Sequence, residues 1–284
     1  MDTFVVKALG AYEVVSNYAH LHGYSQLERV RVGEVFYWVK RHRYPGKQAG
    51  EIHALRFWGP GLGRTPELVA WSVDPAVVIL REIEGVAPEL NDLELWREGG
   101  EWLSRMHALE NDWLGAPDTE GAPQSAPEKD SVASFAVAVE TRLRDGRDHG
   151  WLDEREIAFV SEQMNIRAPS LAGDTPRAVH RDFGPRNWIA RPGGGLAGVI
   201  DFEHAVWGNR CMDLGRLSIY SLDARPDLRE AFFAGYGPVS AELEAQIEAG
   251  RLLHAVGGLV FAHRVGDVPF QEMNRLALWR MMGR

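Results

Sequence analysis

The sequence has 284 residues and is 45% hydrophobic, which is enough for one large domain or for two lobes that each bury a core. Its net charge of -9 at pH 7 argues against non-specific nucleic-acid binding, which needs a basic surface. No apolar run approaches the roughly 18 residues of a membrane span, and the chain does not start with the pattern of a signal peptide, so we expect a soluble cytoplasmic protein without a membrane or nucleic-acid partner.

The first part of the chain is predicted to consist mainly of strands. Stretches rich in Val, Tyr, Phe and Trp are separated by turns with glycine, as in an antiparallel meander, at residues 18–25, 27–33 and 34–42. Residues 48–58 then carry apolar side chains at helical spacing, which predicts a helix. The apolar run at residues 73–85 predicts a buried strand that ends in a turn at Gly85.

The rest of the chain is predicted to be mostly helical. Residues 91–110 begin with a candidate N-cap, Asn91 or Asp92, and the pair Gly99–Gly100 weakens this helix without ending it. One face of the helix is expected to carry four apolar residues: Leu93, Trp96, Leu103 and Met106. Residues 115–130, rich in Pro, Ala, Gly and acids, predict an exposed loop. Further helical patterns follow at residues 132–143, 154–164 and 241–265.

A polar cluster precedes a predicted hairpin. The stretch HRDFGPRN, residues 180–187, leads into two short apolar segments, WIA and LAGVID, which a glycine-rich turn joins. Because a hairpin returns the chain to the place where it left, we expect Asn187 at its start and Asp201 at its end to be near neighbours. His180 and Asp182 lie on the loop just before, so four polar groups converge at one end of the hairpin.

These polar groups suit phosphoryl transfer. An amide oxygen of Asn187 beside the Asp201 carboxylate offers the oxygen ligands that Mg²⁺ prefers, and leaves positions for water and for phosphate oxygens. Asp182, on a loop rather than on the strand, can stay off the metal and accept a proton from an attacking hydroxyl group. This division of labour is typical of a reaction in which positioning and charge neutralisation supply most of the catalysis.

The two segments also resemble a known family. HRDFGPRN followed by VIDFEHA is similar to the HxDxxxxN and IDxxxA motifs of the aminoglycoside phosphotransferase and choline kinase superfamily, which is related to the protein kinases. The resemblance implies an α+β class, two-lobed protein-kinase-like fold. Residues 1–83 would form a small antiparallel β N-lobe that binds nucleotide and ends in the hinge. Residues 84–284 would form a larger, mostly helical C-lobe with the acceptor pocket.

The same resemblance assigns roles to the residues of the cluster. It implies that Asp182 is the catalytic base, that Asn187 and Asp201 hold Mg²⁺, and that His180 supports the loop. ATP is implied as the phosphoryl donor, with GTP as an alternative.

The family also requires a lysine on the third strand that pairs with a glutamate on the following helix. Lys40 ends the stretch FYWVK and Glu51 lies in the predicted helix, so the two can meet, and the lysine is implied to contact the α and β phosphates. The chain has only four lysines, which favours a specific role for this one. The loop HGYSQL, residues 22–27, takes the place of the nucleotide-covering loop, and Ser25 is implied to touch a phosphate.

The crossing strand VVILREIEG is similar to the hinge between the lobes of these kinases. Adenine is then read by backbone atoms, and the register implies the Arg81 carbonyl and the Ile83 amide, with Ile79 behind the ring. Backbone recognition leaves little trace in side chains.

Three residues near the motifs are candidates for support or for substrate contact. Relatives commonly have Gly where this chain has Arg181, and HRD is the form found in protein kinases. However, Asp213 follows the second motif directly, which leaves no room for a long activation segment, so a small-molecule kinase fits better. Asp213 is expected to buttress the catalytic loop through Arg181 or His180. Glu203 is expected either to contact metal or substrate or to face solvent.

The acceptor is expected to be a small hydroxylated molecule, and the acidic charge favours a cationic one. An antibiotic of aminoglycoside or related type, as for a resistance kinase, is the first hypothesis, and a choline, ethanolamine or amino-alcohol substrate is the alternative. Four acids are candidates for an amine pocket: Asp145, Asp148, Asp153 and Glu154. Three aromatic residues are candidates for a cage around a quaternary amine: Trp151, Trp207 and Tyr236. The alternative is that each of them packs in the hydrophobic core. The oligomeric state cannot be predicted.

Two other classes are weighed against a kinase. A non-haem iron oxygenase needs an HxD motif and a later histidine, and His204 or His254 could serve as that histidine. However, such sites lie in a double-stranded β-helix, and the mostly helical second half of this chain cannot form one. A pseudokinase is disfavoured because every catalytic position is filled. A P-loop enzyme is excluded, because GPGLGRT lacks the lysine and the spacing of GxxxxGK[ST].

Overall fold

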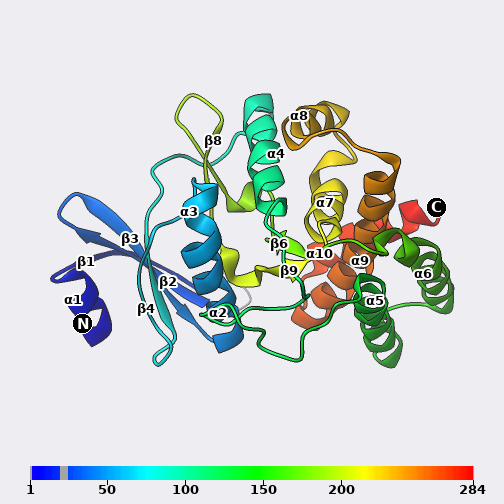
Figure 1. Ribbon diagram of the computed structural model, residues 1–284, viewed down its shortest axis with the longest axis horizontal. Coiled ribbons are helices and arrows are strands. Elements are labelled where there is room, and N and C mark those ends of the chain that lie inside the picture. The colour runs from blue at the N-terminus through cyan, green and yellow to red at the C-terminus, as the bar shows by residue number, and fades with distance from the viewer. Residues whose placement is uncertain (1, 20–24, 284) are drawn as a thin grey trace.

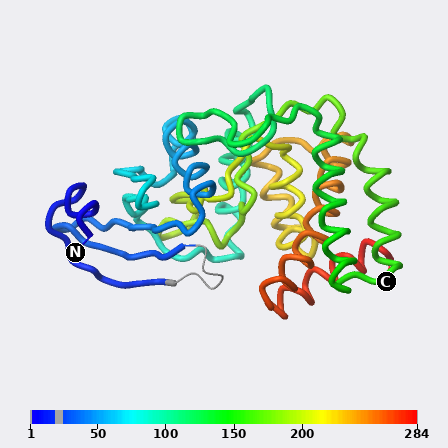
Figure 2. The backbone as a smooth tube through the Cα atoms, turned by 90° about the horizontal axis from the view of Figure 1, so that it is seen from below, coloured from blue at the N-terminus to red at the C-terminus, as the bar shows by residue number. Residues whose placement is uncertain are grey.

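The computed structural model describes residues 2–19 and 25–283. One lobe is built around a sheet and the other from helices, which confirms the expected two-lobed α+β fold (Figure 1). From below, the sheet strands in blue lie on one side of the molecule and the helices in green to red lie on the other (Figure 2). Among the described residues, no helix is both long enough and apolar enough to span a bilayer.

Within the described part of the chain, five strands form one antiparallel sheet in the order β1-β2-β3-β5-β4. The strands are β1 (Glu13–Ala19), β2 (Ser25–Val32), β3 (Val35–His42), β4 (Leu68–Ser72) and β5 (Val77–Arg81). The expected meander is confirmed for β2 and β3. The position of the first strand is wrong, because β1 begins at Glu13, and residues 20–24 of the expected strand lie outside the described residues.

Two elements of this lobe were not expected. Helix α1 (Thr3–Leu9) is capped by Asp2, whose Oδ1 accepts hydrogen bonds from the amides of Phe4 and Val5. Val5 of this helix is fully buried against one face of the sheet. Strand β4 is short and follows a proline, and its side chains are only half-buried, so its sequence pattern does not clearly predict a strand.

The helical segment between β3 and β4 covers the other face of the sheet. It runs as α2 (Pro45–His53), a π-helical turn (Ala54–Trp58) and α3 (Gly59–Leu62), which confirms the helix predicted at residues 48–58. Gly63 ends it in the left-handed region, with φ of 61°, where a side chain would be strained. This segment brings Glu51 under strand β3.

The helical lobe begins at α4 (Leu93–His107), and Asp92 is its N-cap: Oδ1 accepts from the amides of Glu94 and Leu95. Leu93 is 48% exposed, so the expectation that it joins the buried face of this helix is wrong. The predicted helices at 132–143, 154–164 and 241–265 lie within three of the later ones. These later helices are α5 (Ser131–Asp148), α6 (Glu154–Arg167), α7 (Cys211–Leu217), α8 (Pro226–Tyr236), α9 (Ala241–Val265) and α10 (Val268–Met281).

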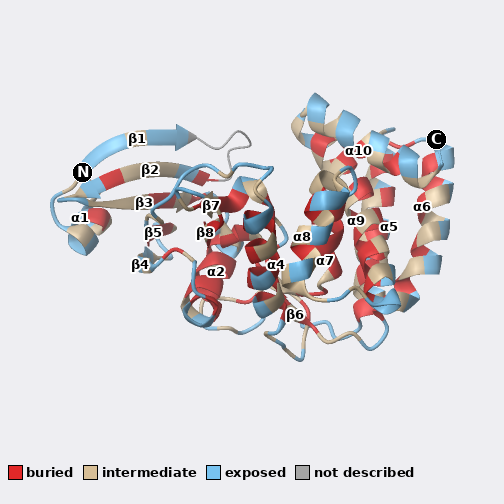
Figure 3. Cartoon of the chain, turned by 90° about the horizontal axis from the view of Figure 1, so that it is seen from above, coloured by how far each residue is buried: buried red, intermediate tan, exposed pale blue. Residues whose placement is uncertain are grey.

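Helices α7 and α9 form the centre of this lobe, and α6 and α10 form its outside (Figure 3). Helix α9 buries side chains on all sides, including Leu243, Leu252 and Leu259. The glycines predicted to weaken α4 are packing residues, because a Cβ at Gly100 would overlap the backbone of α8 at Phe232. Gly235 of α8 would likewise overlap the Arg97 carbonyl of α4. Small residues therefore set the close crossing of these helices.

Among the described residues, two short pairs of antiparallel strands lie between the lobes. Strand β6 (Arg177–Val179) pairs with β9 (Val206–Gly208), and β7 (Trp188–Ala190) pairs with β8 (Leu196–Val199). The second pair is the hairpin that the sequence predicts. Strand β6 leads into the HRD loop, so these pairs position the polar cluster between sheet and helices.

Candidate active site

A cavity of about 730 Å³ lies between the sheet and the β7–β8 hairpin. This volume is within the roughly 300–1,000 Å³ of small-molecule sites. Its apolar lining includes Leu27, Trp38, Leu80, Ile83, Ile189 and Ile200. Its polar lining includes Ser25, Lys40, Glu51, Asn187 and Asp201. Ser25 thus lies where the resemblance implies, and residues 22–24 of its loop are outside the described residues. The cavity offers an apolar slot with a charged end.

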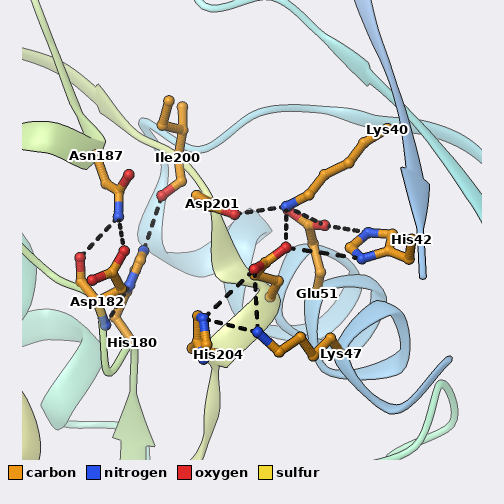
Figure 4. A network of polar contacts seen from close by, with 11 residues as sticks. Lys40, His42, Lys47, Glu51, His180, Asp182, Asn187, Ile200, Asp201 and His204 are labelled. Carbon is orange, nitrogen blue, oxygen red and sulfur yellow. Dashed lines mark hydrogen bonds and ion pairs between the residues drawn. The ribbon is translucent and has the colours of Figure 1, made fainter. Parts of the chain in front are cut away.

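Lys40 is the centre of the charged end (Figure 4). Its Nζ lies 3.2 Å from Glu51 Oε1 and 2.6 Å from Asp201 Oδ1, so the pairing expected with Glu51 is present. Glu203 Oε2 lies 3.1 Å from the same nitrogen. The lysine is 3% exposed and Glu203 is 6% exposed, so of the two alternatives for Glu203 the solvent-facing one is wrong. One buried ammonium group is shared by three carboxylates.

The pKa values of these groups follow from burial and from their neighbours. Burial lowers the pKa of Lys40, but the carboxylates of Asp201, Glu51 and Glu203 outweigh it and raise the pKa above its usual value. Burial raises the pKa of Asp201, but the Lys40 ammonium group outweighs it and lowers the pKa to about 2. The pKa of Glu51 is also lowered, against burial, by Lys40 and His42. All three groups are therefore charged at neutral pH.

The HRD loop is held by Asp213 at the start of α7. Its Oδ2 accepts from the His180 amide at 2.8 Å and its Oδ1 accepts from the Arg181 amide at 2.6 Å, which places Asp213 as the expected buttress. Arg181 has a left-handed backbone, with φ of 65°, a strain that these bonds offset. His180 is fully buried, and its Nε2 donates to the Ile200 carbonyl at 3.0 Å, which ties the loop to the end of the hairpin.

Asp182 is bound on both carboxylate oxygens. Its Oδ2 accepts from Asn187 Nδ2 at 2.7 Å, and its Oδ1 makes an ion pair with Arg216 Nη2. Asn187 Nδ2 also donates to the Asp182 carbonyl at 2.9 Å, so Asn187 Oδ1 points away from Asp182 (Figure 4). The side chain of Asp182 is 32% exposed and remains accessible to a ligand.

Asn187 and Asp201 reach the same cavity from the two ends of the hairpin, as expected. Asp201 has a left-handed backbone, with φ of 68°, and Lys40 binds only its Oδ1 among the described contacts. In the described residues, no group of three or more His, Cys, Asp or Glu side chains is arranged to hold a metal ion. A site of one amide oxygen and one carboxylate fits Mg²⁺, which takes its other ligands from water and phosphates, and fits poorly with ions that need an all-protein cage.

The hinge segment borders the apolar slot. Arg81 and Ile83 both line the cavity. The Ile83 amide makes no backbone hydrogen bond in the described part of the chain, so it is available to a ligand. The expectation for Ile79 is wrong, because its side chain is buried on the opposite face of the sheet, against Val5. Side chains alternate along a strand, so Leu80 takes the place expected for Ile79.

Four residues of the site were not predicted. His42 Nε2 lies 2.8 Å from Glu51 Oε2, and Lys47 Nζ lies 3.4 Å from Glu203 Oε1. His107 Nε2 lies 3.2 Å from Asp213 Oδ2, and Arg216 binds Asp182. Of these four, only Lys47 could have been singled out from the sequence, because the chain has only four lysines. The others are contacts between distant segments.

The residues suggested for an amine pocket lie elsewhere. Asp145 pairs with Arg264 at 2.8 Å, and Asp153 caps helix α6. The three aromatic residues are in separate clusters: Trp151 stacks on His149 and His263, Trp207 packs on Trp58, and Tyr236 packs on His107. Two of the four acids are therefore engaged in other contacts, and the three aromatic residues do not form a cage.

A kinase-like fold with this site defines a phosphotransferase, and comparison with known proteins agrees. The model of the phosphotransferase enzyme family, APH, matches residues 25–249. The chain therefore belongs to the phosphotransferase enzyme family, as an enzyme that transfers a phosphoryl group to an alcohol. The search of curated proteins gave no match.

Solved structures of similar fold cover nearly the whole chain. A protein described as a fructosamine-3-kinase, from Thermobifida fusca YX-ER1, is 19% identical over 98% of this chain and 97% of that chain, with a TM-score of 0.70. A thermostable mutant of aminoglycoside phosphotransferase APH(4)-Ia, in complex with AMP-PNP and hygromycin B, is 15% identical over 97% and 95%, with a TM-score of 0.71. Macrolide 2'-phosphotransferase type I is 14% identical over 97% and 95%, with a TM-score of 0.66. At these identities the likeness shows the shared fold.

Proposed function

We propose that the protein transfers the γ-phosphoryl group of ATP to a hydroxyl group of a small molecule. The observation that carries this proposal is the convergence of Lys40, Asn187 and Asp201 at the charged end of one cavity, with Asp182 hydrogen-bonded to Asn187 beside it. Residues 1–83 would bind the nucleotide, with the base in the apolar slot beside Ile83. Residues 84–284 would supply the catalytic loop and the acceptor pocket. GTP is the alternative donor.

The residues divide the chemistry among them. Lys40, held by Glu51, would contact the α and β phosphates, and Ser25 would contact a phosphate from strand β2. Asn187 Oδ1 and Asp201 would hold Mg²⁺, which when bound neutralises phosphate charge. Asp182 would orient the acceptor hydroxyl and accept its proton while the oxygen bonds to the γ-phosphorus and ADP leaves. His180 and Asp213 would keep the loop in place, and Glu203 would hold Lys40.

For the acceptor, we propose first an antibiotic of aminoglycoside or related type. The neighbours bound to hygromycin B or named for macrolides support this class. A fructosamine-type amino sugar is the second candidate, because that neighbour has the highest identity of the three. The argument for a cationic acceptor is weakened, since Asp145 and Asp153 are engaged elsewhere and Arg216 makes an ion pair with Asp182. Choline-type amines and anionic sugars therefore belong in the same screen.

The test is a coupled assay of ADP release with ATP or GTP and Mg²⁺. Aminoglycosides, macrolides, nucleoside and peptide antibiotics, fructosamines, choline-type amines and sugar acids are supplied in turn. We expect one class to raise ADP release in the wild type and not in Asp182→Asn, with the phosphorylated product found by mass spectrometry. Acceptor-dependent turnover that Asp182→Asn retains would refute the role of Asp182.

A further inference from the structure

The carboxylate of Asp182 is fixed from two sides by different parts of the chain. Asn187, five residues later, donates to Oδ2 at 2.7 Å, and Arg216 of α7 makes an ion pair with Oδ1. Two charge-assisted contacts on separate oxygens define the plane of a carboxylate, which a single contact does not. Arg216 is 18% exposed at its side chain, less than the 32% of its partner. The contact is thus partly buried, unlike a solvated surface pair.

Arg216 is itself held in place. It lies one helical turn after Asp213, which binds the backbone amides of the same loop. One turn of α7 therefore fixes both the backbone and the side chain of the HRD loop. The guanidinium carbon of Arg216 lies 5.1 Å from the centre of the Tyr220 ring, and a cation over an aromatic face is stabilised there.

Tyr220 connects this contact to the outer helix α10. Its hydroxyl donates to Asn274 Oδ1 at 2.7 Å, and Asn274 is fully buried and donates to the Phe270 carbonyl at 2.7 Å. Burial raises the pKa of Tyr220 to about 12, so the hydroxyl stays protonated and remains a donor. A Cβ at Gly258 of α9 would overlap Asn274, so the helix leaves room for this network. Tyr220 lies in a π-helical turn (Ser218–Leu222), a distortion often found at functional sites.

We propose that Arg216 is a positioning residue for the transfer reaction, which holds the Asp182 carboxylate in the orientation that receives the acceptor hydroxyl. The inference rests on the function proposed above, because it assigns Arg216 a role through Asp182. Arg216 does not line the described nucleotide cavity, so its loss acts on the chemical step and leaves nucleotide binding intact.

The test compares Arg216→Gln, Arg216→Lys and a matched control, Arg229→Gln. Arg229 also pairs with a carboxylate, Glu244 at 2.6 Å, and lies over an aromatic ring, Phe233 at 4.8 Å, but far from the HRD loop in sequence. Because small displacements of a catalytic group are costly, we expect Arg216→Gln to lower kcat by about 10- to 100-fold with the KM for ATP changed less than about threefold. Arg216→Lys should recover part of the loss, and Arg229→Gln should behave as wild type.

A second measurement separates positioning from folding. Guanidinium at millimolar concentration should raise the kcat of Arg216→Ala several-fold and should not raise that of Asp182→Asn or of the wild type. Equal kcat in Arg216→Gln and Arg229→Gln would overturn the inference while the proposed function stands. A kcat loss with no rescue by lysine or guanidinium, accompanied by a lower Tm, would reduce Arg216 to a structural residue. A wild type inactive with every acceptor and with water would refute both proposals.

Discussion

The ammonium nitrogen of Lys40 lies 2.6 Å from Asp201 Oδ1, although the two residues are 161 positions apart in the chain. Glu51 and Glu203 share the same nitrogen from α2 and from the turn after Asp201. The lysine therefore joins the sheet, the helix below it and the end of the hairpin. A buried cation with three acidic partners is needed both for the geometry of the site and for the charge balance of the core.

Replacing Lys40 with alanine should destabilise the protein in a pH-dependent way. Removing one partner of a buried ion pair typically costs about 3–5 kcal/mol, because the remaining charge has no partner. Without the cation, burial should raise the pKa of the remaining carboxyl groups above their unfolded values, so the variant is stabilised at low pH and loses that stability as pH rises. We expect urea denaturation to show a larger deficit at pH 8 than at pH 5.5. Lys129→Ala, an exposed lysine, is the control, and a pH-independent deficit would contradict this account.

Asp182→Ala and Asp201→Ala should abolish phosphoryl transfer while the protein remains folded. A positioned base contributes about 10²- to 10⁴-fold, and the loss of Asp201 removes one ligand of the proposed metal site. Steady-state kinetics with the acceptor found in the screen provide the measurement, with circular dichroism to confirm folding. Asp227→Ala, which removes an exposed partner of Arg225, should retain full activity.

Lys40→Ala should act mainly by raising the KM for ATP.

Gly235→Ala should destabilise the crossing of α4 and α8. A Cβ at this position would overlap the Arg97 carbonyl and lie 3.0 Å from the Glu101 amide, so the helices must move apart. Overpacking of this kind costs about 1–3 kcal/mol or more. Gly61→Ala is the matched control, since a Cβ there meets no atom of the described residues within 4 Å. A Tm for Gly235→Ala equal to that of Gly61→Ala would show that the crossing relaxes freely.

His53 should make the protein less stable in mild acid. Both ring nitrogens are buried without a hydrogen-bond partner among the described residues, and the ring packs against Phe57, Trp58 and Trp207. Burial, with a smaller repulsion from Arg56 and opposed by Asp118, lowers the pKa of His53 to about 4. Between pH 6.5 and 4 the unfolded chain binds a proton that the folded chain does not, so stability falls as pH falls.

His53→Phe should therefore lose less stability than the wild type between pH 7.5 and pH 5, by about 1–2 kcal/mol. Urea denaturation at the two pH values measures the difference. His149→Phe, on an exposed residue at the end of α5, controls for the loss of a histidine. Equal pH dependence in the wild type and in His53→Phe would show that the pKa of His53 is not lowered in the folded protein.

The sequence predicts the parts of the site that are close together in the chain. Asn187 and Asp201 flank a hairpin with a glycine-rich turn, and their approach follows from strand geometry alone. Helix α9 was predicted over the residues that form it from its long helical pattern, and the structure shows its Ser240 cap and the glycine after its end. The third strand and the following helix likewise placed Lys40 near Glu51.

Contacts between distant segments could not be predicted. Arg216 of α7 reaches Asp182 of the HRD loop, and His107 of α4 reaches Asp213, and nothing in their local sequence shows this. The error at Ile79 is a register error of one residue, which transfers a side chain to the other face of a strand. Glu203 was ambiguous because an acid after a strand is usually solvated, and its burial depends on two lysines from other elements.

The hairpin that carries Asn187 is also joined to the segment just after the hinge and to the sheet lobe. Val86 and Ala190 exchange backbone hydrogen bonds just after the hinge, and the Val199 amide donates to the Arg64 carbonyl at 2.8 Å. A Cβ at Gly85 would overlap Ala190, so the hinge and the hairpin are in direct contact. The hairpin is therefore bonded directly to the sheet lobe at Arg64 and packs against the hinge at Gly85. Rotation of the sheet lobe against the hairpin must therefore break the backbone hydrogen bond between Val199 and Arg64.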